Sequence, residues 1–233
     1  MEGIHEVVLD GASTYNTPHE KQTYFQTRLK QREAVLGLTE AERHELTREE
    51  LYKRLENGIG STPIKKIPLA NNNVLIQKFE IANPTETHYD RCYVRLIKLL
   101  EEQGTITPGD ILLETTSGSA GVSFAWICKL LGYEAIVFMP SFVPEPRILE
   151  VSNLASAVHV NGNKEEYLLA CARDMVDYYR AHKEEVNAQG KRIYMPNHSQ
   201  HDFTPETFST IADELKESLG DTKIDYFVGG IGN

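Results

Sequence analysis

The chain has 233 residues, of which 40% are hydrophobic and 25% are charged, so it is long enough to bury a sizeable core. Its formal net charge of -10 disfavours nucleic acid or an anionic membrane as the main partner, because both attract basic surfaces. No long apolar run is present, and the first residues lack the basic-then-apolar order of a signal peptide. We therefore expect a soluble, cytoplasmic protein.

Residues 1–57 are polar and heavily charged, and we expect them to form a helical extension. Two Thr-x-x-Glu sequences have the spacing of a capping box, which predicts short helices after Thr39 and after Thr47. The second helix is expected to end at Gly58. This extension either packs against the main body or a partner, or is merely solvated.

After residue 58, apolar runs of strand length alternate with helical patterns. Strands are expected at 74–79, 111–114, 135–139, 157–160, 192–195 and 226–230. Helices are expected at 90–103, from the loop after residue 114 to residue 131, at 165–182 and at 205–219. This alternation is typical of an α/β fold with a parallel sheet covered by helices. Ligands of such sheets bind at the carboxyl ends of strands, so the loops leading into helices are the candidate sites.

The loop between the strand at 111–114 and the next helix is built from small residues. These residues are Thr116, Ser117, Gly118, Ser119 and Ala120. Backbone N–H groups can approach a ligand closely here, and the following helix adds free donors and positive dipole character. Such a loop favours an anionic ligand, either a carboxylate or a phosphate. A plain strand-to-helix turn with hydroxyl caps is an equal alternative, since the glycines fit neither a P-loop nor a dinucleotide fingerprint.

Several segments together, in their order along residues 58–233, resemble one enzyme family. They are GIGSTPI (58–64), KFE (78–80), NP (83–84) with DR (90–91), TSGSAG (116–121), GY (132–133), MP (139–140) and VGGIG (228–232). This set resembles the cysteine synthase and cystathionine β-synthase branch of the pyridoxal-phosphate enzymes, which also contains the tryptophan synthase β chain. The resemblance implies that fold, with two parallel-type sheets covered by helices.

The resemblance also implies a division into domains. After the extension at 1–57, residues 58–87 and 196–233 would belong to a larger domain whose carboxyl-terminal part is missing from this chain. Residues 88–195 would form a smaller α/β domain. Because a sheet strand at the end of the chain leaves apolar faces uncovered, we expect either a fragment or a complementing chain. The resemblance also implies that a second copy of this chain can be the partner, in a homodimer.

The same resemblance implies pyridoxal 5'-phosphate as cofactor, bound through a lysine that directly precedes the Asp-Arg pair. That position is Tyr89 here. A phenol cannot form an imine, and its ordinary pKa of about 10 makes it a poor base at neutral pH. Lys78 aligns with a different lysine of the family, and Lys98 lies over two turns into the following helix.

The sequence departs from the family pattern in three further places, two of them single residues and the third a shortened loop. Ser119 stands where an asparagine would bond the pyridine hydroxyl, and Tyr194 stands where a glutamine would help to hold the substrate carboxylate. Gly232 and Asn233 match only the first two positions of the cofactor's phosphate loop. By the same resemblance, residues 116–120 would bind the carboxylate of an amino-acid substrate.

Two functions follow from these residues. The first is a cysteine-synthase-like protein without imine chemistry, which binds an amino acid or another small carboxylate at 116–120. The second is an active enzyme of β-replacement or β-elimination on serine-type amino acids, seen here as a fragment or an altered form. Function must be argued from the site and not from the fold, so the residues in hand favour the first.

A metal protein is a third and weaker alternative. His198 and His201 have a spacing that can serve zinc, with Asp202 adjacent and His88 elsewhere, but no cysteine or carboxylate cluster converges on them. Arg91 is expected to pair with a nearby carboxylate, and Trp126 is expected in the core.

The cysteines are the last feature with a bearing on chemistry. Cys92, Cys128 and Cys171 are odd in number and far apart, which favours reduced thiols packed in helices over a disulfide frame.

Overall fold

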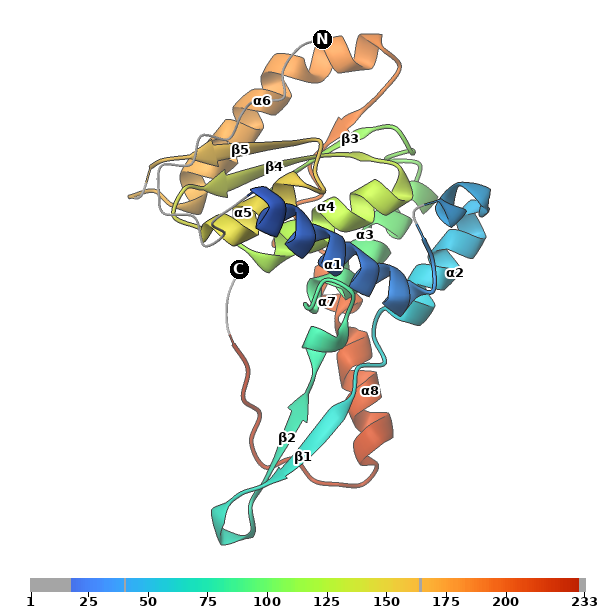
Figure 1. Ribbon diagram of the computed structural model, residues 1–233, viewed down its shortest axis with the longest axis vertical. Coiled ribbons are helices and arrows are strands. Elements are labelled where there is room, and N and C mark those ends of the chain that lie inside the picture. Colours follow the sequence, from blue (N-terminus) through green and yellow to red (C-terminus); the bar gives the residue numbers. More distant parts are fainter. Residues whose placement is uncertain (1–17, 40, 164, 231–233) are drawn as a thin grey trace.

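The computed structural model describes residues 18–39, 41–163 and 165–230 (Figure 1). Its helices are α1 (Pro18–Leu36), α2 (Arg48–Gly58), α3 (Tyr89–Glu102), α4 (Ser119–Leu131), α5 (Glu145–Ser152), α6 (Leu168–Ala188), α7 (Thr204–Thr207) and α8 (Ser209–Leu219). Its strands are β1 (Ile64–Pro68), β2 (Val74–Lys78), β3 (Ile111–Thr115), β4 (Glu134–Pro140), β5 (Ala157–Asn161) and β6 (Ile193–Tyr194). Short 3-10 turns lie at Glu42–Glu45, Ala70–Asn72 and Glu80–Ala82.

The centre of the described chain is a four-stranded parallel sheet with the strand order β5-β4-β3-β6. The chain steps outward from β3 to β4 and β5, and then returns to the other side of β3 to form β6. The strand order therefore reverses between β3 and β6. In open parallel sheets such a reversal separates the loops that follow the two strands, and ligands bind in the crevice between them. The expected parallel sheet is confirmed.

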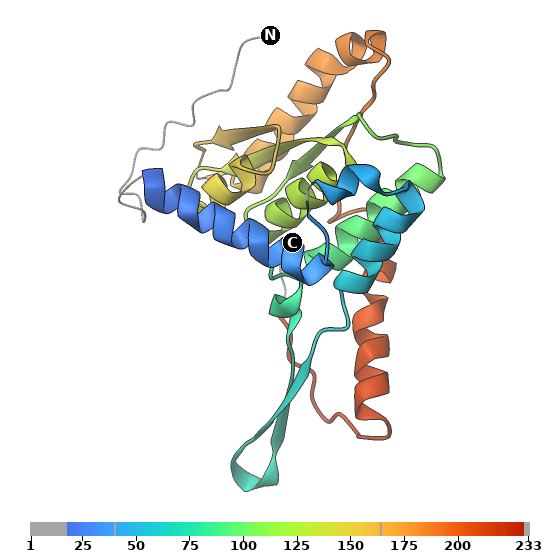
Figure 2. The same cartoon turned by 45° about the vertical axis from the view of Figure 1, so that its right-hand side comes forward.

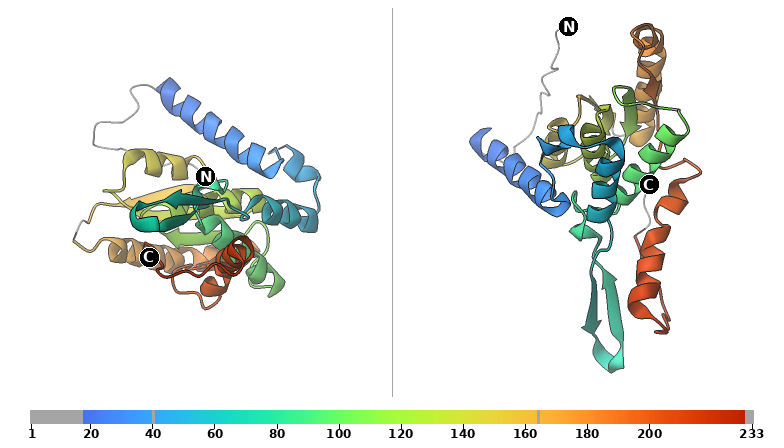
Figure 3. Two further views of the ribbon diagram at one scale, coloured as in Figure 1. Left: turned by 90° about the horizontal axis from the view of Figure 1, so that it is seen from below. Right: turned by 90° about the vertical axis from the view of Figure 1, so that its right-hand side faces the viewer.

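Helices cover both faces of this sheet (Figures 1 and 3). Helices α3, α4 and α5 pack on one face, where their buried apolar side chains include Leu96, Phe124 and Ile148. Helix α6 packs on the other face through Cys171 and Met175. Strands buried on both faces read as continuous apolar runs, which is why the sequence predicts β3 and β4 well.

A narrow arm made of the β1–β2 hairpin and helix α8 projects from the sheet-bearing body (Figures 1 and 2). β1 and β2 are antiparallel, with Ile64 opposite Lys78 and Pro68 opposite Val74. The resemblance led us to expect a second sheet of the parallel type, and this expectation is wrong for the described residues. The short connection at 69–73 allows a hairpin, whereas two parallel strands need a crossover of about a dozen residues.

The predicted strand at 226–230 is also wrong. These residues are irregular, and Tyr226, Phe227 and Val228 are 89%, 85% and 87% exposed. Their composition suits a buried strand, but a strand exists only where a neighbour pairs with its backbone, and no described strand lies beside them.

Three helical predictions need correction. The helix expected at 205–219 is divided into α7 and α8, and the one expected at 165–182 runs over Leu168–Ala188. No helix was expected between residues 139 and 157, yet α5 begins there with Pro146 in its first turn, where a missing N–H costs nothing.

The amino-terminal region also differs from its prediction. Thr47 and Glu50 form the expected capping box at the start of α2, whereas Thr39 precedes only a 3-10 turn. Helix α1 was not predicted, because it has no apolar stripe and its contacts to the body include the buried pair Arg32–Glu150. Leu51 of α2 joins the core of the body.

The domain boundaries expected at residues 57, 87 and 195 stay a prediction. Within residues 18–39, 41–163 and 165–230, no helix is long and apolar enough to cross a membrane.

Candidate functional site

The loop at 116–120 lies after β3, at the switch point of the sheet. Its backbone is fixed from both sides: the N–H of Thr116 donates to the carbonyl of Phe138 in β4 at 3.1 Å, and the N–H of Gly118 donates to Thr116 Oγ1 at 3.2 Å. At Gly121 a Cβ atom would stand 2.5 Å from Thr116 Cγ2, so only glycine allows this approach. Helix α4 begins at Ser119, and its first turn therefore presents N–H groups beside the loop.

A buried carboxylate ties the start of α3 to the start of α4. Ser123 Oγ donates to Asp90 Oδ1 at 2.6 Å, and the N–H of Thr85 donates to Asp90 Oδ2 at 2.8 Å. Burial raises the pKa of Asp90 to about 6. Since Tyr89 is the first residue of α3 and Ser119 the first of α4, this contact places both at the same end of the helix pair.

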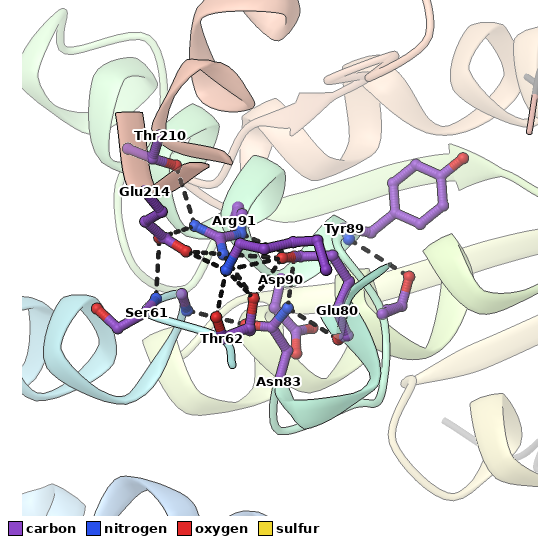
Figure 4. A network of polar contacts seen from close by, with 12 residues as sticks. Ser61, Thr62, Glu80, Asn83, Tyr89, Asp90, Arg91, Thr210 and Glu214 are labelled. Atoms are coloured by element: carbon purple, nitrogen blue, oxygen red, sulfur yellow. Dashed lines mark hydrogen bonds and ion pairs between the residues drawn. The ribbon is translucent and has the colours of Figure 1, made fainter. Parts of the chain in front are cut away.

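Tyr89 is half-buried among aromatic rings. Its ring centroid lies 4.2 Å from that of His88, 5.3 Å from that of His198 and 6.3 Å from that of Phe208. Burial raises the pKa of the Tyr89 phenol above its ordinary value. Figure 4 shows the side chain of Tyr89 directed away from the polar network around Arg91. An apolar, aromatic environment therefore keeps the phenol protonated.

A second buried carboxylate, Glu114, lies at the end of β3 and binds His198 from the loop after β6. His198 Nδ1 is 3.0 Å from Glu114 Oε2 and 2.8 Å from the hydroxyl of Tyr93, and the His198 N–H donates to the same carboxylate at 3.2 Å. Sequence reasoning considered His198 only under the metal alternative and missed this contact. The available signal was an acidic residue at the end of an otherwise apolar strand.

Arg91 lies at the centre of a polar network that joins the hairpin, α3 and α8 (Figure 4). Its Nε donates to Glu80 at 2.8 Å and its Nη2 to Glu214 at 2.9 Å, and Lys78 Nζ donates to Glu214 at 2.6 Å. Burial alone would raise the pKa of Glu214, but the bonds from Arg91 and Lys78 lower it to about 2. The structural role expected for Arg91 is confirmed.

The other predicted residues divide into those that the structure places and those that it leaves out. Tyr194 packs against the apolar core at the end of β6, and Trp126 is buried there as expected. Gly232 and Asn233 lie outside the described residues. Cys92, Cys128 and Cys171 are free thiols buried in α3, α4 and α6, as expected.

The metal alternative receives no support from the geometry. The described residues contain no group of three or more histidine, cysteine or acidic side chains arranged to hold a metal ion. His198 Nδ1 is used by Glu114 and Tyr93, and His201 Nδ1 accepts from the backbone N–H of Phe203.

A covalent link to pyridoxal phosphate needs a free lysine amine near position 89. The position that the resemblance assigns to the imine-forming lysine carries the phenol of Tyr89. The lysines that flank it in the sequence are engaged elsewhere: Lys78 Nζ bonds Glu214 and Thr62, and Lys98 Nζ bonds Glu56 at 2.6 Å. These side chains do not fit a covalent link to the cofactor.

Comparisons with known proteins agree on the family. Residues 55–233 match the family described as "Pyridoxal-phosphate dependent enzyme". A curated cysteine synthase of Staphylococcus aureus is 29% identical over 178 residues, which are 75% of this chain and 54% of that protein. This chain therefore spans about half the length of the curated relatives that it matches.

Solved structures show the same architecture. A hydrogen sulfide-producing enzyme of Fusobacterium nucleatum is 26% identical, with a TM-score of 0.60 over 70% of this chain and 52% of its own. A lysine-to-alanine mutant of O-ureido-L-serine synthase, bound to O-ureido-L-serine, is 21% identical and matches the fold with a TM-score of 0.65 over 76% of this chain and 53% of its own. The fold is therefore that of the tryptophan synthase β-like enzymes, and the chain belongs to the family of pyridoxal-phosphate-dependent enzymes.

Proposed function

We propose that this chain is a cysteine-synthase-like member of the family that binds an amino acid, or a related small carboxylate, at residues 116–120 without imine chemistry at position 89. One observation carries the proposal: a half-buried phenol occupies position 89, and the amines of Lys78 and Lys98 bond to Glu214 and Glu56. Imine formation needs a primary amine within reach of the aldehyde, and none is supplied by these groups.

The carboxylate site is supported by its place and its construction. The loop lies at the switch point between β3 and β6, where parallel sheets bind ligands. The close approach of Gly121 to Thr116 holds the loop against the first turn of α4, whose N–H groups favour an anion. A relative in which a lysine is replaced by alanine holds O-ureido-L-serine, so an amino acid can occupy this fold when a lysine is lost.

The second candidate is an active enzyme of β-replacement or β-elimination on a serine-type amino acid. The family match over residues 55–233 and the similarity to cysteine synthase favour it. It requires an amine from elsewhere and the half of the relatives' length that this chain does not span.

Two measurements on the purified chain separate the candidates. Calorimetric titration with L-serine and O-acetyl-L-serine tests the carboxylate site, and Ser117→Asp is expected to abolish binding because it adds a negative charge to the loop. Ser218→Asp, an exposed position in α8, is the matched control that leaves binding unchanged. Borohydride reduction in the presence of pyridoxal phosphate, followed by mass spectrometry, tests the imine.

The proposal expects amino-acid binding and no lysine adduct above the background of exposed surface lysines. A stoichiometric adduct on one lysine, with a visible absorbance band before reduction, would support the second candidate instead. If neither amino acid binds to the unmodified chain, the carboxylate site is refuted.

Association and location extend this proposal. A homodimer or a complementing chain is expected from the family, and light scattering after size-exclusion chromatography tests it. The buried free thiols suit a reducing cytoplasm, where disulfides are rare, and fractionation of the source cells tests this location.

A further inference from the structure

We propose that His198 and the ring of Tyr89 form a subsite for the free α-ammonium group of the amino acid whose carboxylate binds at residues 116–120. This inference rests on the proposed function and goes beyond it, because it states how an amino group is recognised where no imine forms. It predicts selectivity for amino acids over the same carboxylates that lack the amine.

The chemistry of the ligand sets the requirement. An amino acid that is not condensed with a cofactor keeps a positive ammonium group, which loses water when it enters a site. Burying such a charge is costly unless an acceptor or a π face replaces the lost solvation. The backbone N–H groups of residues 116–120 serve the carboxylate, so the acceptor for the ammonium group is sought in a neighbouring segment.

His198 supplies an acceptor of fixed orientation. The carboxylate of Glu114 can only accept, so the proton of a neutral His198 ring lies on Nδ1, 3.0 Å from Glu114 Oε2. The second nitrogen, Nε2, then carries a lone pair. Only 6% of the His198 side chain is exposed, and none of the described residues forms a hydrogen bond with Nε2. An ammonium group is the kind of donor that this nitrogen lacks.

Tyr89 supplies an aromatic ring beside the imidazole of His198. Its ring stands nearly perpendicular to the His198 ring, at 89°, with the centroids 5.3 Å apart. The ring of Phe208 lies 6.3 Å from that of Tyr89 and continues the aromatic wall. A cation within about 6 Å of an aromatic face is attracted to it, most strongly where water is excluded.

The subsite adjoins the carboxylate loop through Glu114. Oε2 of Glu114 binds His198, while Oε1 accepts from the N–H of Thr115 at 3.0 Å, one residue before the loop begins. The imidazole therefore lies beside the junction of β3 and the loop. An α-amino acid, whose carboxylate and ammonium are joined through one carbon atom, suits a donor loop and an acceptor placed in this way.

Calorimetric titration with two matched ligands tests the inference on the full chain. L-serine carries the amine, and 3-hydroxypropionate is the same carboxylate without it. The unmodified protein is expected to bind L-serine at least about tenfold more tightly, the factor that corresponds to about 1.4 kcal/mol. His198→Leu and Tyr89→Leu are each expected to remove most of this preference and to leave the affinity for 3-hydroxypropionate within about twofold.

Three further variants keep the test decisive. Tyr89→Phe retains the ring and is expected to keep most of the preference for L-serine. His44→Leu, at an exposed histidine far along the chain, is the matched control. His198→Gln retains a donor for Glu114 and removes the aromatic nitrogen, so it replaces His198→Leu if that variant fails to fold, as judged by circular dichroism.

The outcomes separate this inference from the function on which it rests. Equal affinity of the unmodified chain for the two ligands, or an equal loss of both ligands in the His198 and Tyr89 variants, overturns the ammonium subsite and leaves the carboxylate site standing. Absence of binding of both ligands to the unmodified chain refutes the carboxylate site, and the ammonium subsite with it.

Discussion

Tyr89 and Arg91 stand in the same turn of α3, yet they belong to two regions of opposite character. Arg91 lies in a network in which every charged partner is matched: Glu80 and Glu214 accept from it, and Lys78 also donates to Glu214. Tyr89 points away from this network (Figure 4), and the rings of His198 and Phe208 lie near its own ring. There a buried histidine keeps a ring nitrogen without a hydrogen bond from the described residues.

The two regions differ in whether their polar groups still have room for a ligand. A fully matched network joins the hairpin, α3 and α8, and its polar groups have no capacity left for a ligand. Beside Tyr89, Nε2 of His198 has no hydrogen bond from the described residues, and a polar atom left open in this way is completed by water or by a ligand. We therefore expect changes around Arg91 to act on stability and changes around Tyr89 to act on binding.

The largest expected effect comes from Arg91→Ala. The change leaves Glu80 without its bidentate partner and leaves Glu214 with Lys78 and the N–H of Ser61, and breaking a buried ion pair by removing one partner costs about 3–5 kcal/mol. Urea denaturation followed by circular dichroism measures the loss of unfolding free energy. Arg91→Lys is the control, which restores the charge without the planar fork and recovers only part of the loss. An unchanged midpoint would contradict the structural role.

The next effect is a pH dependence of stability caused by Asp90. Burial raises its pKa to about 6, above the unfolded value of about 3.9, so the folded chain holds this proton more tightly. Its contribution to stability is therefore present below pH 4 and is lost as the pH rises through 6, by an amount on the order of 3 kcal/mol. Asp90→Asn is expected to flatten this slope in urea titrations between pH 4 and 7.

Glu214 is expected to give a pH dependence of stability with the opposite sign. Its pKa is lowered to about 2 by Arg91 and Lys78, which outweigh the opposite effect of burial. Its contribution is present above the unfolded pKa of about 4.3 and is lost as the pH falls towards 2. Glu214→Gln should therefore weaken the acid-induced loss of stability and leave the slope between about pH 5 and 7 unchanged, which assigns that slope to Asp90.

Gly121→Ala is expected to affect both regions. The added methyl group would stand 2.5 Å from Thr116 Cγ2, and relief of such an overlap costs about 1–3 kcal/mol. Because Thr116 opens the carboxylate loop, the same change should weaken L-serine binding more than the stability loss explains. Gly162→Ala is the matched control, since nothing lies within 4 Å of its added Cβ. Equal effects of the two substitutions would contradict the tight approach at Gly121.

The central sheet could be predicted from sequence because its signals are local. β3 and β4 are apolar runs of strand length, and α4 ends at Gly132, whose φ of 76° is the left-handed conformation that glycine readily adopts. The loop at 116–120 could be located for the same reason, as a run of small residues between two strong patterns, and its binding of a carboxylate stays a prediction.

The remaining features depend on contacts between distant segments. Glu114 and His198 are separated by 84 positions, and no local pattern joins them. Helix α1 is held by Arg28 to Glu86 and by Arg32 to Glu150, which are pairs that charge composition alone does not specify. The apolar residues at 226–230 carry a strand pattern, but a neighbour decides whether a strand forms. The sequence therefore predicts elements better than the pairings that build a site.

The smallest expected effect, Thr47→Ala, serves as a reference outside both regions. Thr47 Oγ1 accepts from the N–H of Glu50, and Glu50 Oε2 accepts from the N–H of Thr47 at 2.8 Å, so the change removes half of a capping box at a cost of about 1 kcal/mol. Urea denaturation should show this loss, and Thr47→Ser should restore it. L-serine affinity is expected to stay the same, because the side-chain hydrogen bonds of Thr47 lie within the first turn of α2. If Thr47→Ala also weakened binding, global stability and the ligand pocket would be coupled, and the loss of affinity in Gly121→Ala could no longer be assigned to its loop.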